Sequence, residues 1–459
     1  MWIYASAVIV YLAALAVVGY WRSRRVRTSD DFLVAGRTLP AHVLVFTLLS
    51  TWIGSGSLFG GAGLGYRAGF PALWQSAGAW VGIAIIYYIA PRVRRIAQYT
   101  VPDILELRYG PAARVLGTIT TVLAYTTIAA YQFRGGGRLL NLIAGIEPRT
   151  GALLTGAFCV AYTVFAGMLS IAYLDIINGM MMLVGVAAAV IYLTGRVGGD
   201  GSVFAELRPD QLTLFGSMSP AEALALFLPT MFLLLGEANM YQKFFSAKDE
   251  RAARVAVGGW IAGTIVVETL IVAIGVFGSV AVPGLGLGES ETIVVRVAVG
   301  VLPAVLGVLL LAGAGAIIVS TATSMLLTPA TNLTRDVYVR FLNPGAPDRQ
   351  ILLYTRLVVV ALGFIGLAAG SLFPTILAMA LWAYTMYGAG VTPALLAALL
   401  WPRVTREAGI VSILSGMITT LVWEIAALAH GSHPMGIQTI YPALAASIGT
   451  LVMLSIRRR

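Results

Sequence analysis

Long apolar runs separated by short polar segments dominate the hydrophobic pattern of the chain. A membrane-spanning α-helix takes about 20 mostly apolar residues, and most of these runs reach or exceed that length. The pattern predicts about 13 membrane helices, over 2–21, 41–65, 70–90, 113–142, 149–167, 170–195, 219–244, 254–281, 292–333, 350–371, 373–400, 408–429 and 437–456. We expect the two longest of these segments to include a broken or interfacial piece.

Composition supports one integral membrane domain over 1–459, without a soluble appendage. Hydrophobic residues make up 59% of the chain and charged residues 11%, with a mean hydropathy of +0.88. The net charge of +10 does not indicate nucleic-acid binding, because the basic residues form short clusters between apolar runs. The single cysteine, Cys159, lies in an apolar run and excludes a disulfide framework. The expected surroundings are a lipid bilayer, with no nucleic acid and no obligate protein partner.

The distribution of basic residues predicts the topology. Most Lys and Arg residues fall in alternate connections, on the side reached after segment 2–21. The positive-inside rule places that side in the cytoplasm, with the N-terminus outside, the C-terminus inside and segment 2–21 retained as a first helix. The residues counted on this side include Arg22, Arg25, Arg27, Lys243, Lys248, Arg335, Arg340 and Arg457 to Arg459.

Two membrane segments contain helix-weakening residues at corresponding positions. Segment 41–65 is rich in glycine, and segment 219–244 contains Pro229 and Gly236. Unsatisfied backbone groups in lipid cost several kcal/mol, so broken helices persist where they line a cavity, and paired breaks indicate a transport site. The alternative is that small residues only allow close helix packing. We interpret 41–195 as a first repeat of five helices and 219–400 as an inverted second repeat. Residues 1–40 precede the repeats, and 401–459 add two helices.

A cluster of hydroxyl side chains interrupts the apolar segment 292–333. Hydroxyl and carbonyl oxygens suit a hard cation, so the cluster favours an ion site. Hydrogen bonds from the hydroxyls to carbonyls one turn earlier are the structural alternative. The cluster consists of Ser320, Thr321, Thr323 and Ser324.

Ionisable residues inside predicted membrane helices form a second group of candidates. They are Asp175, Glu237, Arg134 and Arg138. A charge at such depth is costly and indicates function. Arg134 could hold a solute carboxylate with two parallel hydrogen bonds, and Glu237 could meet an ammonium group. The alternatives are a permanent Arg134–Glu237 salt bridge and an Arg138 side chain that reaches the membrane interface.

Several motifs in order resemble the sodium:solute symporter family, whose members carry glucose, proline, pantothenate, choline and sialic acid. The motifs are Asp31-Phe-Leu-Val-Ala-Gly-Arg37, Ser50-Thr-Trp-Ile-Gly-Ser-Gly56, Tyr241-Gln-Lys-Phe-Phe-Ser-Ala-Lys-Asp249 and Ser320-Thr-Ala-Thr-Ser324. The resemblance implies an all-α, LeuT-type 5+5 inverted-repeat fold with one helix before the core and two after it.

The resemblance also implies sodium sites. The principal site matches the backbone carbonyls of Ser50, Ile53 and Ile317 together with the hydroxyls of Ser320 and Thr321. A second site, present in some relatives, matches Asp175, Ser320, Thr323 and Ser324.

The substrate position implied by the resemblance is Glu237. In the sugar carriers of the family this position looks like an amide. A carboxylate there argues against a neutral sugar. Trp52 and Tyr241 are candidates for an aromatic gate, and the full expected substrate set is Glu237, Arg134, Ser57, Trp52 and Tyr241.

These features predict a sodium-coupled symporter of the cell membrane, not an enzyme, that imports a carboxylate or zwitterion by alternating access. The rivals are proton coupling through Asp175 or Glu237, choline or quaternary amine uptake, and a membrane receptor module. Continuous ion conduction is disfavoured, because the segment 292–333 contains only one polar cluster.

Overall fold

The computed structural model describes residues 2–24, 28–96, 98–197 and 203–456. Within these residues the regular secondary structure is helical, apart from one isolated β-bridge between Leu39 and Ala247. Arg25, Arg27 and Arg457 to Arg459, which entered the charge count, lie outside the described residues.

The first part of the chain, up to the 198–202 gap, contains eight α-helices among its described residues. They are α1 (Trp2–Ser23), α2 (Ser29–Val34), α3 (Ala41–Trp52), α4 (Ala62–Ala68), α5 (Leu73–Ile96), α6 (Val101–Tyr109), α7 (Pro111–Ala144) and α8 (Pro148–Val197). Helix α8 is interrupted at Gly167, whose φ of 61° and ψ of 173° are not helical. This residue lies between the expected helices 149–167 and 170–195.

The second part contains the remaining helices. They are α9 (Pro220–Gly236), α10 (Ala238–Ser246), α11 (Glu250–Ala281), α12 (Leu287–Ser290), α13 (Ile293–Gly300), α14 (Ala304–Asn332), α15 (Asp348–Ala369), α16 (Ile376–Gly390), α17 (Thr392–Leu400), α18 (Arg406–His430) and α19 (Ile440–Ile456). A π-helical segment, Leu333–Leu342, continues α14. The expected segment 292–333 is therefore divided between α13 and α14, whereas 113–142 lies within one continuous helix.

The membrane-spanning character of the chain is clear from these lengths. Among the described residues, 10 helices are long and apolar enough to cross a membrane, or up to 11 with one bent pair, and α19 is a shorter apolar helix. The sequence-based count of about 13 spans stays a prediction.

Both expected broken helices are confirmed. Helix α3 ends at Trp52, and the chain resumes as a π-helical turn, Gly56–Gly61, followed by α4, with a bend of 53° across the break. Helix α9 ends at Gly236, and Glu237 adopts a φ of −59° and a ψ of 112° before α10 begins. Each break exposes main-chain groups in the interior of the molecule.

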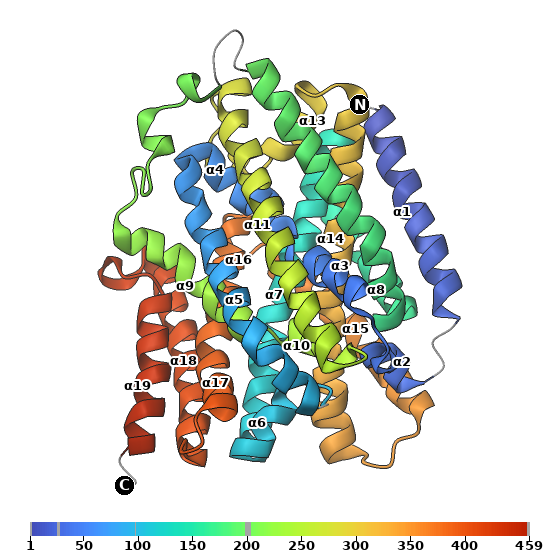
Figure 1. Ribbon diagram of the computed structural model, residues 1–459, viewed down its shortest axis with the longest axis vertical. Helices are drawn as coiled ribbons and strands as arrows, with labels where there is room; N and C mark the ends of the chain where they lie inside the picture. Colours follow the sequence, from blue (N-terminus) through green and yellow to red (C-terminus); the bar gives the residue numbers. More distant parts are fainter. Residues whose placement is uncertain (1, 25–27, 97, 198–202, 457–459) are drawn as a thin grey trace.

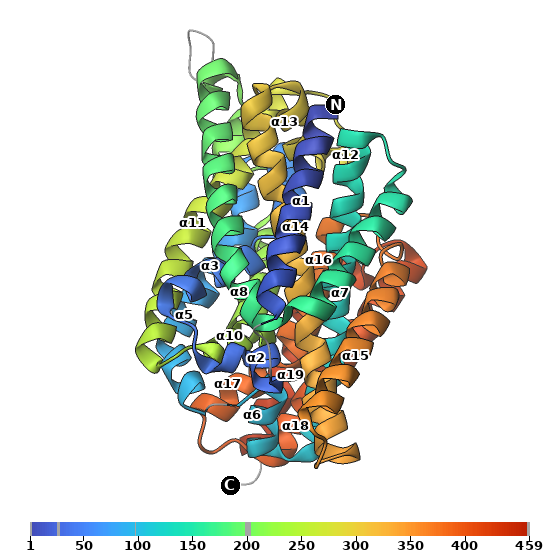
Figure 2. The ribbon, with the colours of Figure 1, turned by 90° about the vertical axis from the view of Figure 1, so that its right-hand side faces the viewer.

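Helix α14 lies in the middle of the bundle, where it packs against α7, α8 and α1 (Figures 1 and 2). Helices α18 and α19 pack together and against α16 at the opposite side from α1 (Figure 1). Helix α1 begins near one end of the molecule and α19 ends near the other (Figures 1 and 2). This arrangement fits termini on opposite sides of the membrane, although which side faces the cytoplasm stays a prediction.

Close packing of α7 against α8 depends on glycine. A Cβ atom at Gly137 would lie 2.5 Å from the backbone oxygen of Pro148 and 2.7 Å from the backbone nitrogen of Ala152. On α8, a Cβ atom at Gly151 would lie 2.9 Å from the Cα atom of Gly137. The backbones of the two helices therefore touch at this crossing.

We predict that Gly137→Ala lowers the thermal stability of the purified protein by the equivalent of about 1–3 kcal/mol, because backbone atoms must move to admit the methyl group. Gly449→Ala on α19 is the matched control, since a Cβ atom there meets nothing within 4 Å. Equal melting temperatures for the two variants, measured in the same detergent, would contradict this account of the crossing.

Candidate functional site

Carbonyl oxygens at the break of α3 face a hydroxyl on α14. The Thr321 hydroxyl is 3.2 Å from the carbonyl oxygen of Ser50 and 3.1 Å from that of Ile53. The nearest helical hydrogen bond before the break is donated by Ile53 N–H to the Leu49 carbonyl. One hydroxyl proton cannot satisfy two carbonyl oxygens fully, so the geometry suits a cation among these three oxygens.

The other expected principal ligands lie on the same stretch of α14. Ile317, one turn before Thr321, is buried, and Ser320 is buried beside it. The Ser320 hydroxyl donates a hydrogen bond of 2.5 Å to Asp175 Oδ1. This bond uses the proton of Ser320 and leaves lone pairs on its oxygen.

Asp175 is buried on α8 within a set of hydrogen-bond donors. Its carboxylate accepts a 2.6 Å bond from the Thr47 hydroxyl in addition to the bond from Ser320. The Ser50 hydroxyl donates to the Asp175 carbonyl over 2.9 Å. Asp175 therefore connects α8 to α3 and α14 directly beside the carbonyls of the break.

The remaining two members of the hydroxyl cluster make different contacts. The Thr323 hydroxyl donates to the Ser320 carbonyl over 2.9 Å, as the structural alternative anticipated. The Ser324 hydroxyl lies 3.2 Å from the Thr51 hydroxyl on α3. Neither contacts the Asp175 carboxylate in the described conformation.

Lys243 is a buried charge that the sequence analysis placed incorrectly among the cytoplasmic basic residues. Its side chain is fully buried on α10, and its ammonium group donates to the Thr47 carbonyl over 2.8 Å and to the Thr51 hydroxyl. It interacts electrostatically with Asp175 and Glu237. The apolar and aromatic residues around Lys243 in the sequence are the signal that could have indicated burial.

Glu237 lies at the break between α9 and α10, with several tyrosines in its vicinity. One oxygen of the buried Glu237 carboxylate has no hydrogen-bond partner among the described residues. Four tyrosines lie within electrostatic reach of this carboxylate: Tyr125, Tyr131, Tyr384 and Tyr387. The rings of Tyr125 and Tyr387 are 5.3 Å apart between centroids, and the hydroxyls of Tyr131 and Tyr384 are 3.3 Å apart.

A second buried carboxylate, Glu268 on α11, was missed by the sequence analysis. Its Oε1 accepts a 2.8 Å hydrogen bond from Trp52 Nε1 and a 3.5 Å hydrogen bond from the Ser57 hydroxyl. The side chains of Ser76 and Trp80 are further donors beside the carboxylate, but Oε2 accepts no well-formed hydrogen bond within the described part of the chain. The Trp52 ring lies 6.0 Å from that of Tyr384. Glu268 is an ionisable residue inside a predicted membrane helix, so the reasoning applied to Asp175 and Glu237 could have identified it as well.

Little space remains at this point in the described conformation. A cavity of about 10 Å³ is lined by Ser57, Gly61, Gln75, Ser76, Glu268, Ile271 and Val272. Such a volume holds about one water molecule, so a solute requires movement of the surrounding helices. We name the region bounded by Trp52, Tyr131, Glu237, Glu268 and Tyr384 the central chamber.

Arg134 and Tyr241 both hydrogen-bond to backbone carbonyls. Arg134 donates bonds of 2.6 Å to each of the Phe373 and Pro374 carbonyls, and the ion pairs of the described residues do not include one with Glu237. Arg138 pairs with the buried Glu291. The Tyr241 hydroxyl donates to the Leu235 carbonyl over 2.9 Å and so bridges the α9–α10 break.

Comparison with known proteins identifies relatives along nearly the whole chain. The high-affinity proline transporter PutP of Bacillus subtilis strain 168 is 26% identical over 96% of this chain and 95% of the relative. The osmoregulated proline transporter OpuE of the same organism is 25% identical over 98% and 94%. These relatives are transporters, not enzymes.

Solved structures share the fold. A Na+-coupled sialic acid symporter in a substrate-bound, outward-open state matches with a TM-score of 0.85 at 17% identity, covering 99% of this chain and 97% of that one. MhsT in complex with L-phenylalanine matches with a TM-score of 0.58 at 17% identity, over 90% and 98%. These likenesses identify the LeuT-type fold.

The family model described as the sodium:solute symporter family matches residues 32–418, which is most of the chain. Together with the relatives and the membrane-spanning helices, this match identifies a multi-span transporter of the cell membrane. The chain belongs to the sodium:solute symporter family.

Proposed function

We propose that the protein uses the sodium gradient to import a small zwitterionic solute by alternating access. The observation that carries this proposal is the position of the Thr321 hydroxyl between the carbonyl oxygens of Ser50 and Ile53. The structural similarity to a Na+-coupled symporter supports sodium as the coupling ion. The repeats 41–195 and 219–400 would be the two halves that move relative to each other.

To bind the proposed sodium ion, the Thr321 hydroxyl would turn its proton away from the two carbonyls and present its oxygen to the ion. Five oxygens would then surround it, from the carbonyls of Ser50, Ile53 and Ile317 and the hydroxyls of Ser320 and Thr321. The Ser320 hydroxyl uses its proton in the hydrogen bond to Asp175, so the lone pairs of the Ser320 oxygen are available to the ion. Bound sodium would fix α3 against α14 and thereby shape the central chamber.

A second sodium ion beside Asp175 is a further part of the proposal, with Ser320, Thr323 and Ser324 as its other ligands. The buried ammonium of Lys243 lies within electrostatic reach of Asp175. Two unit charges a few ångströms apart interact by a few kcal/mol at an effective dielectric constant of about 20. Lys243 and sodium would therefore compete for the same carboxylate.

The solute is proposed to place its ammonium group between the two carboxylates of the central chamber. Glu237 and Glu268 each have an oxygen without a partner among the described residues, and the rings of Trp52 and Tyr384 offer cation–π contacts. The solute carboxylate would meet the hydroxyls of Tyr131 and Tyr384, which lie beside Gly56 at the α3 break. The relatives named as proline transporters handle a zwitterion of this type.

Quaternary amine uptake is the second candidate, favoured by the two carboxylates and the aromatic rings of the same chamber. Such a solute needs no carboxylate partner. Proton coupling through Asp175 or Glu237 remains the rival mechanism, and uptake that follows a pH gradient without sodium would favour it.

We predict that Thr321→Val raises the sodium concentration for half-maximal uptake by roughly tenfold, because a contact between a polar group and a charge contributes about 1.5–3 kcal/mol. Thr321→Ser retains the hydroxyl and should stay close to the wild type. Sodium titrations of L-proline uptake in reconstituted vesicles, or of the zwitterion that binds best, would measure this. Equal sodium dependence of the valine and serine variants would remove Thr321 from the site.

Removing the competing ammonium should strengthen sodium binding. Lys243→Met is expected to lower the sodium dissociation constant, fitted from the rise of the melting temperature with sodium concentration, on the order of tenfold, since one like charge is lost. Lys248→Met is the matched control, because Lys248 is exposed. Weaker sodium binding in Lys243→Met, with a native melting transition, would show that the ammonium supports the site and would refute competition.

Glu237→Gln should weaken binding of a zwitterionic amino acid by roughly tenfold or more, because a charge-assisted hydrogen bond to the ammonium is lost. Arg134→Lys should leave the affinity nearly unchanged, since Arg134 binds the Phe373 and Pro374 carbonyls. Calorimetric titration in sodium buffer would compare the two variants. A large loss in Arg134→Lys and none in Glu237→Gln would reverse the assignment of the solute contacts.

A further inference from the structure

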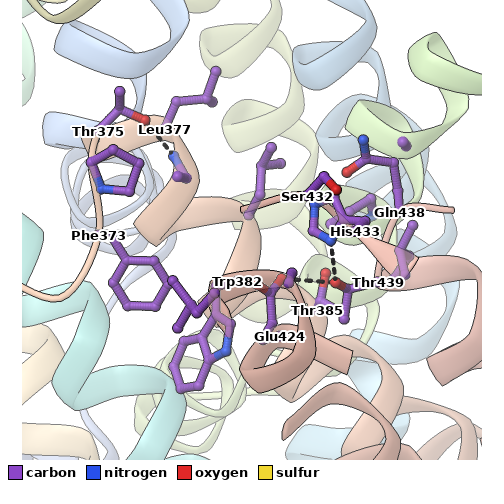
Figure 3. Close-up of a pocket in the computed structure, with 18 of the residues that line it drawn as sticks. Phe373, Thr375, Leu377, Trp382, Thr385, Glu424, Ser432, His433, Gln438 and Thr439 are labelled. Carbon is purple, nitrogen blue, oxygen red and sulfur yellow. Dashed lines mark hydrogen bonds between the residues drawn. The ribbon is translucent and has the colours of Figure 1, made fainter. Parts of the chain in front are cut away.

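A pocket of about 380 Å³ lies between α16, α18, α9 and the segment that connects α18 to α19. This volume falls within the range of small-molecule sites, about 300–1,000 Å³. In Figure 3 the rings of Phe373 and Trp382 lie together at one side of the pocket, with His433 and Thr439 at the other side. We name this cavity the α16–α18 pocket.

The polar groups of the α16–α18 pocket form a short chain that ends on a carboxylate. The Thr439 hydroxyl donates to Glu424 Oε1 over 2.8 Å, and its oxygen lies 3.4 Å from His433 Nδ1 (Figure 3). Since Thr439 uses its proton on Glu424, its oxygen accepts from Nδ1–H of His433. The Thr439 hydroxyl thus orients the Glu424 carboxylate.

The negative charge of Glu424 has no counter-ion in the described part of the chain. Its carboxylate takes part in none of the ion pairs there, and its second oxygen accepts no hydrogen bond from a described residue. The side chain is only partly exposed, at the wall of a largely apolar pocket. A partly buried carboxylate without a cation favours a positively charged ligand.

Aromatic rings define the second property of the ligand. The ring centroids of Phe373 and Trp382 are 5.7 Å apart, with an angle of 51° between the ring planes. Leu377, Leu381 and Leu428 extend the apolar wall beside them. Rings near a carboxylate suit an organic ammonium ion with an apolar body, through cation–π and dispersion contacts.

Helix α16 separates this pocket from the central chamber. Thr385 lines the α16–α18 pocket, whereas its neighbour Tyr384 contacts Trp52 and Tyr131 in the central chamber. At the start of α16, the N–H groups of Ile376 and Leu377 are held by Glu291. The two sites therefore occupy different faces of one helix, and neither shares its carboxylate with the other.

We propose that the α16–α18 pocket is an accessory binding site for an amphiphilic organic ammonium ion, distinct from the solute site, with Glu424 as the charge partner and Trp382 and Phe373 as the aromatic wall.

Binding of benzyltrimethylammonium to the full-length protein in phosphatidylglycerol nanodiscs tests this proposal by calorimetry. Wild type should bind it saturably at one site outside the central chamber, and Glu424→Gln should weaken this binding by about tenfold or more, because the ammonium loses its charge partner. Glu206→Gln is the control for the same charge change at an exposed position. The neutral analogue neopentylbenzene should compete poorly.

Glu237→Gln distinguishes binding in the α16–α18 pocket from binding in the central chamber. This variant should bind benzyltrimethylammonium at the accessory site with the affinity of the wild type. Loss of all probe binding in Glu237→Gln, with full binding in Glu424→Gln, would place the probe in the central chamber and overturn the proposal. Phosphatidylethanolamine nanodiscs separate a soluble ligand from a lipid headgroup. The probe should bind with the same affinity in phosphatidylethanolamine and phosphatidylglycerol nanodiscs. Loss of probe binding in phosphatidylethanolamine would show that the lipid ammonium group occupies the pocket, and would contradict a soluble ligand.

Discussion

Where α3 breaks, the carbonyl oxygens of Ser50 and Ile53 need partners that the helix itself no longer supplies. Backbone oxygens in the interior of a membrane protein need a partner, because no bulk water can supply one. The Thr321 hydroxyl meets both the Ser50 and the Ile53 carbonyls, so α14 must pass directly beside the break. The central position of α14, with α7 and α8 packed around it, follows from this requirement. A cation would satisfy these oxygens more completely than one shared proton can.

Buried charges extend from this point in two directions. Asp175 and Lys243 lie beside the break, where both contact α3 through Thr47. Glu237 and Glu268 lie around the central chamber, each with an oxygen that lacks a partner among the described residues. Lys243 lies within electrostatic reach of both Asp175 and Glu237, whereas Glu268 interacts with neutral hydrogen-bond donors. We therefore propose the first region for the coupling ion and the second for a solute ammonium group.

The sequence predicts the breaks well, and it also identifies the hydroxyl cluster that lies beside the first break, because both have local signatures. Glycine weakens a helix, and the sequence shows it repeatedly within 54–65 and again at Gly236. Hydroxyl residues such as Thr321 are easily recognised within an otherwise apolar helix. Side-chain direction has no such signature. Arg134 falls within a membrane helix, but its guanidinium reaches the Phe373 and Pro374 carbonyls, which belong to a distant segment. Lys243 resembled a cytoplasmic basic residue because only tertiary packing of α10 against α3 buries it.

Sodium-specific stabilisation of the purified protein tests whether the oxygens at the α3 break bind a sodium ion. A ligand that binds only the folded state raises the free energy of unfolding in proportion to the logarithm of its concentration above its dissociation constant. We expect the melting temperature to rise with the logarithm of the sodium chloride concentration once this exceeds the dissociation constant, and not to rise with potassium chloride at equal ionic strength. Identical melting curves in the two salts, over the full range of concentration, would contradict a sodium site at the α3 break.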